Sequence, residues 1–282
     1  MNKNPCYPAL VKKLKKAQKS MREEDNPKLY QQISNLINDN YWETVSDFNI
    51  AMALDTADLS QSLPKEVADI MAAAYLGAAE TNENNERGVA YNNLGVLYYS
   101  GRAGRKNYEK SLHFYQLADQ EGYRLASENL AYCYYYGMGA ETDYEKAYYY
   151  FCKAAIAGRY ESVYKLGDMF RYGYYVDKDE DMVRTAYIKA EYMMKQAWDT
   201  MDTDGLNYGS VYMRLGDMYF EGIGTAKNDD KAYECYQRAE RGFYEQMRHG
   251  SHYNKKDLQR VNERLVELKA ILMERLPKLD WI

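Results

Sequence analysis

Helix-breaking prolines, paired cysteines and long apolar runs are all scarce in this sequence. Only 5 of the 282 residues are proline, which predicts long uninterrupted helices because proline breaks them. No apolar stretch reaches the ~20 residues of a membrane-spanning helix, and the lysine-rich start lacks the apolar core of a secretion signal. The 4 cysteines are far apart and form no CxxC pair: Cys6, Cys133, Cys152 and Cys235. This pattern predicts a reduced, cytoplasmic protein.

Candidates for catalysis and cofactor binding are scarce as well. Of the 3 histidines, His249 and His252 lie in a loop-like stretch beside no carboxylate cluster, which favours a solvated loop over a metal site. The glycines at 101, 104, 137 and 139 follow predicted helix ends, which favours turns over a phosphate-binding loop. No nucleophile–base pair recurs at facing positions. We therefore expect no catalytic residue, no metal, no cofactor and no enzymatic activity.

Tyrosine, in contrast, is abundant. The chain has 32 tyrosines against 6 phenylalanines and 3 tryptophans. Tyrosine buries an apolar ring and keeps a polar tip, so it suits surfaces that are half core and half interface. Hydrophobic residues make up 46% and charged residues 28%, the range of a folded protein. The net charge of −5 argues against attraction of nucleic acid or an acidic membrane by the whole surface.

One set of residues recurs four times between positions 90 and 242. Each copy has a leucine, an aromatic residue four positions later and a glycine seven positions later. A lysine (methionine in the third copy) and an alanine follow in the second half of each copy. The four copies of these marks are Leu94, Tyr98, Gly101, Lys110 and Ala118; Leu130, Tyr134, Gly137, Lys146 and Ala154; Leu166, Phe170, Gly173, Met182 and Ala190; and Leu215, Tyr219, Gly222, Lys231 and Ala239. The leucines are 36, 36 and 49 residues apart.

Each mark has a physical role in a pair of antiparallel helices. Leucine and the aromatic residue are i, i+4 neighbours on one helix face and form its core stripe. The glycine seven residues on falls where that helix must stop, and a left-handed C-cap favours glycine. A glycine directly after the leucine, as in Gly95, lets a second helix approach closely. One such pair cannot bury its own apolar face, so the pairs are expected to stack.

The copies resemble Sel-1-like repeats, which are related to tetratricopeptide repeats. The matching segments read "AYNNLGVLYYSGRAGRKNYEKSLHFYQLADQEG", "ASENLAYCYYYGMGAETDYEKAYYYFCKAAIAG" and "VYMRLGDMYFEGIGTAKNDDKAYECYQRAERG". The copy from Ser162 departs from the pattern, with Tyr174 and Tyr175 in its loop and Met182 in place of lysine. The resemblance implies an adaptor or scaffold role. It also implies an all-α, right-handed α/α superhelical solenoid of helix-turn-helix repeats with N- and C-terminal capping helices.

We divide the chain into an N-terminal helical region at 1–89, four repeats at 90–242 and a C-terminal capping helix and tail at 243–282. The repeats start near 90, 126, 162 and 211. Helices are also predicted at 9–22, 27–38 and 64–80, the last as the second helix of a degenerate repeat, whereas 40–62 is ambiguous. The 13 extra residues before the fourth leucine predict a second helix that is prolonged and then a loop at 202–205; both drift and an elaborated binding face remain open.

The helix face opposite the leucines is the candidate protein-binding groove. Positions −2, +2 and +5 from each leucine fall on this face at 100° per residue. They are Asn92, Val96, Tyr99, Glu128, Tyr132, Tyr135, Tyr164, Asp168, Arg171, Met213, Asp217 and Phe220. Their composition is typical of an interface, and their charges sum to −2, which predicts a partner with apolar anchors and a basic residue. The alternative is that these residues pack on one another.

The favoured function is a scaffold or adaptor that binds a peptide or protein through this groove. The alternative is a regulatory or immunity-type protein that occludes one enzyme or toxin. The basic stretch at 10–22 has two interpretations, a solvated cap helix or a contact with nucleic acid or an anionic membrane. A monomer or weak dimer is expected.

Overall fold

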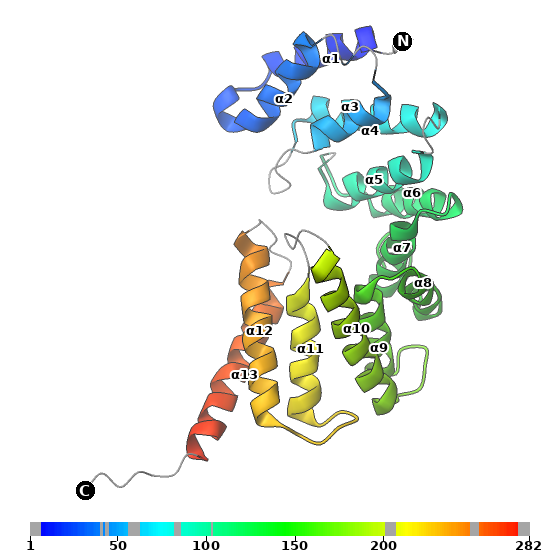
Figure 1. Ribbon diagram of the computed structural model, residues 1–282. Helices are drawn as coiled ribbons and strands as arrows, with labels where there is room; N and C mark the ends of the chain where they lie inside the picture. Colours follow the sequence, from blue (N-terminus) through cyan, green and yellow to red (C-terminus); the bar gives the residue numbers. More distant parts are fainter. Residues whose placement is uncertain are drawn as a thin grey trace, which may run out of the picture. The chain divides into compact units, whose positions relative to one another are not determined.

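The computed structural model describes residues 7–39, 42, 45–55, 63–81, 86–102, 104–200, 207–248 and 254–275, without the side chains of 198–200. All regular structure in these ranges is helical (Figure 1). The helices are α1 (Tyr7–Lys19), η1 (Glu23–Asp25), α2 (Pro27–Asn38), α3 (Asp47–Asp55), α4 (Lys65–Thr81), α5 (Arg87–Ser100), α6 (Tyr108–Gln120), α7 (Arg124–Tyr136), α8 (Tyr144–Ile156), α9 (Tyr160–Tyr172), α10 (Glu180–Thr200), α11 (Tyr208–Glu221), α12 (Asp229–Arg248) and α13 (Lys255–Glu274).

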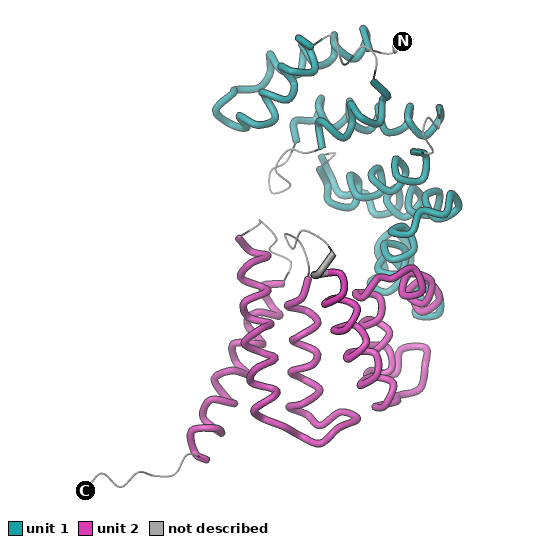
Figure 2. Tube along the Cα trace, in the orientation of Figure 1, with its two compact units in different colours: residues 1–147 teal, residues 148–282 magenta. Residues whose placement is uncertain are grey.

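The chain forms two compact units, at 1–147 and 148–282 (Figure 2). In unit 1, α3 packs against α4 and α5 against α6. In unit 2, α9 packs against α10, α11 against α12, and α12 against α13. Three of the four predicted copies therefore appear as packed helix pairs within one unit, and the all-α repeat architecture is confirmed.

The predicted glycine caps all have left-handed backbone. Gly101, Gly137, Gly173 and Gly222 follow α5, α7, α9 and α11 with φ of 77°, 69°, 74° and 77°. The loop of the third copy differs, because Tyr175 takes φ 67° where the fourth copy has Gly224. It is the non-glycine residue with positive φ in the described part of the chain. A bulky side chain in this conformation carries backbone strain.

The lysine and aromatic marks of the repeat contact each other. The Nζ of Lys110, Lys146 and Lys231 lies 5.1, 5.2 and 5.2 Å from the ring centre of Tyr98, Tyr134 and Tyr219. These cation–π contacts join the two helices of one copy. The third copy has Phe170 and Met182 at the two positions, so both members of the pair change together.

The small residue after the leucine marks a close helix approach, as predicted. A Cβ added to Gly95, Gly167 or Gly216 would lie only 2.4 to 2.7 Å from a tyrosine ring on the second helix. Those rings belong to Tyr115, Tyr187 and Tyr236, each 21 residues after its leucine. Leu54 and Tyr75 have the same spacing on α3 and α4, a helix pair that the ambiguous stretch 40–62 did not reveal.

Both ends of the array are closed by helices. Leu14 and Ala17 of α1 are fully buried, and α1 packs on α2 and α4, so the apolar face of the basic segment 10–22 is covered within unit 1. Its lysines are exposed. At the other end, Leu258, Val261 and Leu268 of α13 are buried in unit 2, which confirms the predicted capping helix. The prolonged second helix is α10, with 21 residues against 13 in α8, and the loop at 202–205 lies outside the described residues.

Candidate functional site

The twelve candidate groove residues divide into a buried and an accessible set. Val96 is 39% exposed, and Tyr99, Tyr132, Tyr135, Arg171 and Phe220 are half-buried. The other six are buried, with 3 to 7% exposure: Asn92, Glu128, Tyr164, Asp168, Met213 and Asp217. The expectation that all twelve lie on an open face is therefore wrong for these six. Within each unit, the first helices of successive copies contact one another through this face, α5 with α7 and α9 with α11.

Asp168 on α9 joins the third copy to the fourth. Its carboxylate accepts hydrogen bonds from Arg214 on α11, at 2.7 Å from Nε and 2.6 Å from Nη2. The Tyr187 hydroxyl of α10 donates to the same group at 2.8 Å. Burial alone would raise the pKa of Asp168, but the nearby cations Arg214 and Lys165 outweigh it and lower this pKa. The carboxylate is thus held ionised inside unit 2.

Asp217 on α11 has the equivalent position in the fourth copy. The Tyr236 hydroxyl of α12 donates to it at 2.7 Å, and Arg171 of α9 approaches from the preceding copy at 2.9 Å. Arg260 of α13 adds a hydrogen bond at 3.2 Å. The other terminal nitrogen of Arg171 donates to Glu221 at 2.7 to 2.8 Å. These contacts link α9, α11 and α13 through one ionic row, which we call the unit 2 row.

Arginines missed by the sequence reasoning neutralise this row. Arg214 directly precedes the fourth leucine and also lies 4.1 Å from the ring centre of Tyr164. Arg264 of α13 lies 4.5 Å from the ring of Phe220. The net charge of −2 predicted for the twelve groove residues counted neither Arg214 nor Arg264. The acidic residues of unit 2 therefore no longer support the expectation of a basic partner. The signal in the sequence was Asp168 itself, because a carboxylate that becomes buried between helices needs a cation beside it.

In unit 1, the corresponding positions form an apolar surface. The residue two positions after the leucine is Val96 on α5 and Tyr132 on α7, where unit 2 has Asp168 and Asp217. The Tyr132 and Tyr136 rings stack one turn apart, 6.1 Å between centres with 3° between planes. Tyr136 is 51% exposed, and its ring also contacts Tyr135 at 4.8 Å. We call Val96, Tyr132, Tyr135 and Tyr136 the unit 1 patch.

Contacts between α5 and α7 hold the unit 1 patch in place. The Asn129 side chain of α7 donates to the Asn92 side chain of α5 at 2.9 Å. Tyr135 packs edge-to-face on Tyr144 of α8, with ring centres 5.5 Å apart. Tyr136 was not among the twelve predicted residues, although it lies one turn after Tyr132. Its position on the helix, six residues after the leucine, lies outside the face defined by positions −2, +2 and +5.

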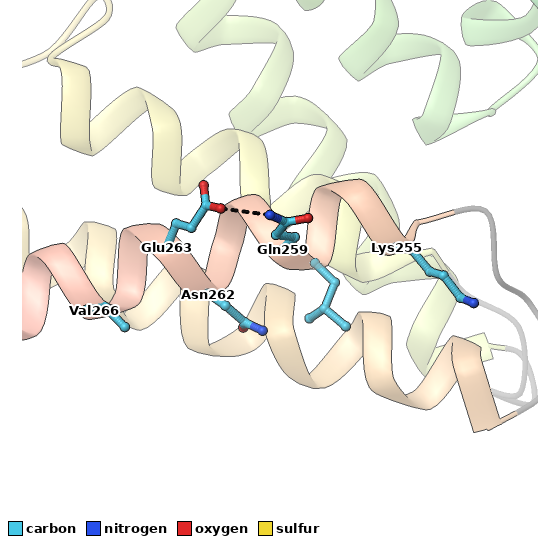
Figure 3. A pocket seen from close by; sticks show the side chains of 6 residues that line it. Lys255, Gln259, Asn262, Glu263 and Val266 are labelled. Carbon is cyan, nitrogen blue, oxygen red and sulfur yellow. Dashed lines mark hydrogen bonds between the residues drawn. The ribbon is translucent and has the colours of Figure 1, made fainter.

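A hollow of ≈ 570 Å³ is lined by side chains of α13 (Figure 3). Its six lining residues all belong to α13, among them Asn262 and Val266, which is 72% exposed. Gln259 donates to Glu263 across one turn at 3.0 Å. Because every described lining residue comes from this one helix, the hollow is not formed by converging elements.

The cysteines of the described residues have no reactive character. Cys133 is buried, and burial raises the pKa of its thiol to about 12, as it does for Cys235. Cys133 is thus the small core residue that its repeat position predicts. Within the described ranges no group of three His, Cys, Asp or Glu side chains is placed to hold a metal ion, while His249 and His252 lie outside them. No described helix is long and apolar enough to cross a membrane.

Comparison with known proteins identifies the repeat. The family model described as "Sel1 repeat" matches residues 88–122, 123–158, 161–197 and 210–242, which together make up half of the chain. No curated protein matches this chain.

Two solved structures share the fold. One is a Sel1 repeat protein from Oxalobacter formigenes, 24% identical with a TM-score of 0.50, covering 73% of this chain and 80% of that chain. The other is a protective antigen of uropathogenic Escherichia coli strains that displays an SLR fold, 22% identical with a TM-score of 0.55. That match covers 88% of this chain, which spans only 52% of the length of the antigen.

Proposed function

This chain belongs to the Sel1 repeat family, whose members generally mediate protein–protein interactions, and we propose that it binds a protein or peptide through the unit 1 patch. The observation that carries the proposal is the stacked aromatic pair of the half-buried Tyr132 and the exposed Tyr136. Large apolar side chains at a solvent-facing position cost free energy unless a partner covers them. Sel1 repeats are typically a non-catalytic scaffold, and we propose no reaction for this chain.

The composition of the unit 1 patch is that of an interface core. Tyrosine is enriched at interface hot spots because it supplies a large ring and a polar tip at low conformational cost. Hot spots also lie in the centre of a contact area, surrounded by residues that exclude water. Tyr132, Tyr135 and Tyr136 are contiguous through ring contacts, and Val96 is the exposed apolar residue at the equivalent repeat position on α5.

The partner should place apolar side chains on this patch and one lysine or arginine on a tyrosine face. The protein itself shows this preference, because four tyrosines in the described part of the chain carry a lysine above the ring. The acidic residues of the unit 2 row do not enter this proposal, since each is paired with arginine. A monomeric or weakly dimeric cytoplasmic protein stays the prediction from sequence.

Site-specific photo-crosslinking tests the proposal. A photoreactive phenylalanine analogue is placed at Tyr136 and, as the matched control, at Tyr149 of α8, which is 61% exposed. The proposal predicts that the analogue at position 136 captures a defined protein. The captured protein must bind purified wild type and lose most of its affinity for the double variant Tyr132→Ala/Tyr136→Ala. Equal capture at position 149, or unchanged affinity of the double variant, would contradict the proposal.

A further inference from the structure

A second hollow, of ≈ 420 Å³, lies among α10, α11 and α12 of unit 2. These helices lie side by side in Figure 1. The hollow is lined by Lys195 of α10, Tyr208 and Tyr212 of α11, and Arg238, Arg241 and Glu245 of α12. Three of the six lining residues are cations and one is an acid, in a chain whose net charge is −5. We call this site the α10–α12 hollow.

The two arginines of the α10–α12 hollow form no ion pair with a residue that the structure describes. Arg238 donates from Nη1 to the Tyr212 hydroxyl at 3.2 Å, lies 5.2 Å from the centre of that ring and interacts with the charge of Glu191. They are three positions apart on α12, where like charges repel. Lys195 is paired with Glu191 at 2.7 Å and lies close enough to Arg238 to interact with its charge. A bound anion would relieve this repulsion.

The remaining lining residues are two tyrosines and one acid. Tyr208 and Tyr212 are buried, with 7 and 5% exposure. The Tyr208 hydroxyl donates to Glu245 at 2.5 Å, so this acid is already engaged. Tyr208 is the first residue of α11, and the positive end of that helix dipole therefore lies near the hollow. Two buried tyrosine rings, three cations and one engaged acid therefore line the same hollow.

We propose that the α10–α12 hollow binds a phosphate monoester through Lys195, Arg238 and Arg241. Two guanidinium groups without an acidic partner match the charge of such a group, about −1.5 to −2 at pH 7. The planar arginine fork also matches the geometry of phosphate oxygens. The volume exceeds that of a bare ion, so the hollow also accommodates the group that carries the phosphate against the tyrosine rings. This site is independent of the unit 1 patch.

Titration calorimetry on the full chain at low ionic strength tests the site. The probes are inorganic phosphate, O-phosphoserine and O-phosphotyrosine, with serine and tyrosine as unphosphorylated controls. At least one phosphorylated probe should bind saturably, and the unphosphorylated controls should not bind. Tight binding of inorganic phosphate identifies a small phosphate as the source, whereas a preference for the phosphoamino acids identifies a phosphorylated side chain.

Charge variants decide whether the α10–α12 hollow is the binding site. Arg241→Gln and Arg238→Gln should each raise the Kd about tenfold or more, because each removes a charge-assisted contact. Lys269→Gln on α13 removes the same charge outside the hollow and should change the Kd less than about twofold. Circular dichroism checks that the variants are folded. Absence of saturable binding by every phosphorylated probe, or an equal loss in Lys269→Gln, would overturn the proposal.

Discussion

The same repeat positions serve opposite purposes in the two units. Two residues after the leucine, unit 1 has Val96 and Tyr132, which contact solvent or neighbouring rings, whereas unit 2 has the buried Asp168 and Asp217. Each aspartate accepts a hydrogen bond from the tyrosine 21 residues after its leucine. Asp168 also pairs with Arg214 of the next first helix, α11, and Asp217 with Arg260 of the capping helix α13. The second copy, whose first helix α7 lies in unit 1, has Phe151 at the position of this tyrosine, so the hydroxyl is absent.

This contrast shows that residues at one repeat position can have two different roles, ion pairing within the protein or an apolar surface. Repeat register fixes which helix face a residue occupies, but the neighbouring side chains decide whether that face is open or filled. An aspartate there recruits arginines and locks successive copies together. A tyrosine or valine leaves an apolar surface, which is suited to a partner.

The largest predicted effect comes from a variant that breaks the unit 2 row. Asp168→Ala should lower the free energy of unfolding by about 3–5 kcal/mol, because it leaves the charge of Arg214 buried without its partner. Chemical denaturation followed by circular dichroism measures the change. Asp177→Ala, at an exposed position of the same copy, should shift stability by less than about 0.5 kcal/mol. Equal effects of the two variants would show that the unit 2 row is not structural.

The pH dependence of stability sharpens the same point. The pKa of Asp168 is lowered in the folded state, so its contribution is fully present above the ordinary value of 3.8. It is lost as the pH falls from that value through the lowered pKa. Wild type should therefore lose more stability than Asp168→Ala between about pH 5 and pH 2. Parallel stability curves for the two proteins would contradict the pairing.

The unit 1 patch should respond in the opposite way. Tyr132→Ala/Tyr136→Ala should weaken partner binding by about 2 kcal/mol or more, roughly 30-fold, because central aromatic residues dominate interfaces. Its effect on the free energy of unfolding should stay near that of one stacked ring pair, about 0.5–1.5 kcal/mol. Affinity and unfolding measured on the same preparations separate the two. A large stability loss with unchanged affinity would make the patch part of the core.

Much of the fold could be predicted because its marks act within one helix pair. Leu94, Gly101 and their equivalents specify a core stripe and a cap that need no distant partner. The unit 2 row could not be predicted, since Arg260 belongs to α13, outside the repeat, and meets Asp217 only after the helices stack. Burial of Asn92 and Glu128 was missed for the same reason. The short helix α3 was missed because its marks are degenerate.

The cap that ends α7 gives a smaller effect. Gly137→Val should destabilise the protein by about 1–3 kcal/mol, since a β-branched residue is strained at φ 69° and its Cβ would lie 2.9 Å from Thr142 Oγ1. Gly137→Asn should cost less, because asparagine tolerates the left-handed conformation. Thermal unfolding of both variants gives the comparison. Equal midpoints for valine and asparagine would exclude backbone strain as the cause.

The smallest effect concerns the equivalent loop of unit 2. Tyr175→Gly should stabilise the protein by about 0.5–1 kcal/mol, because it relieves a left-handed backbone at φ 67°. The gain is limited by loss of the ring contact with Tyr148, whose centre is 5.6 Å away. Tyr175→Phe keeps the strain and should leave the thermal midpoint unchanged. A destabilised glycine variant would show that the ring contact outweighs the strain.

Hydrogen–deuterium exchange of the free protein and of its complex with the crosslinked partner tests the central claim most directly. The account predicts slower exchange on binding in α5 and α7, at 87–100 and 124–136, because the partner covers the unit 1 patch. It predicts no change in the exchange rate of α11 at 208–221, because the arginines of the unit 2 row already pair with the acidic residues of that helix. Protection of 208–221 without protection of 124–136 would contradict the account and move the binding surface to unit 2.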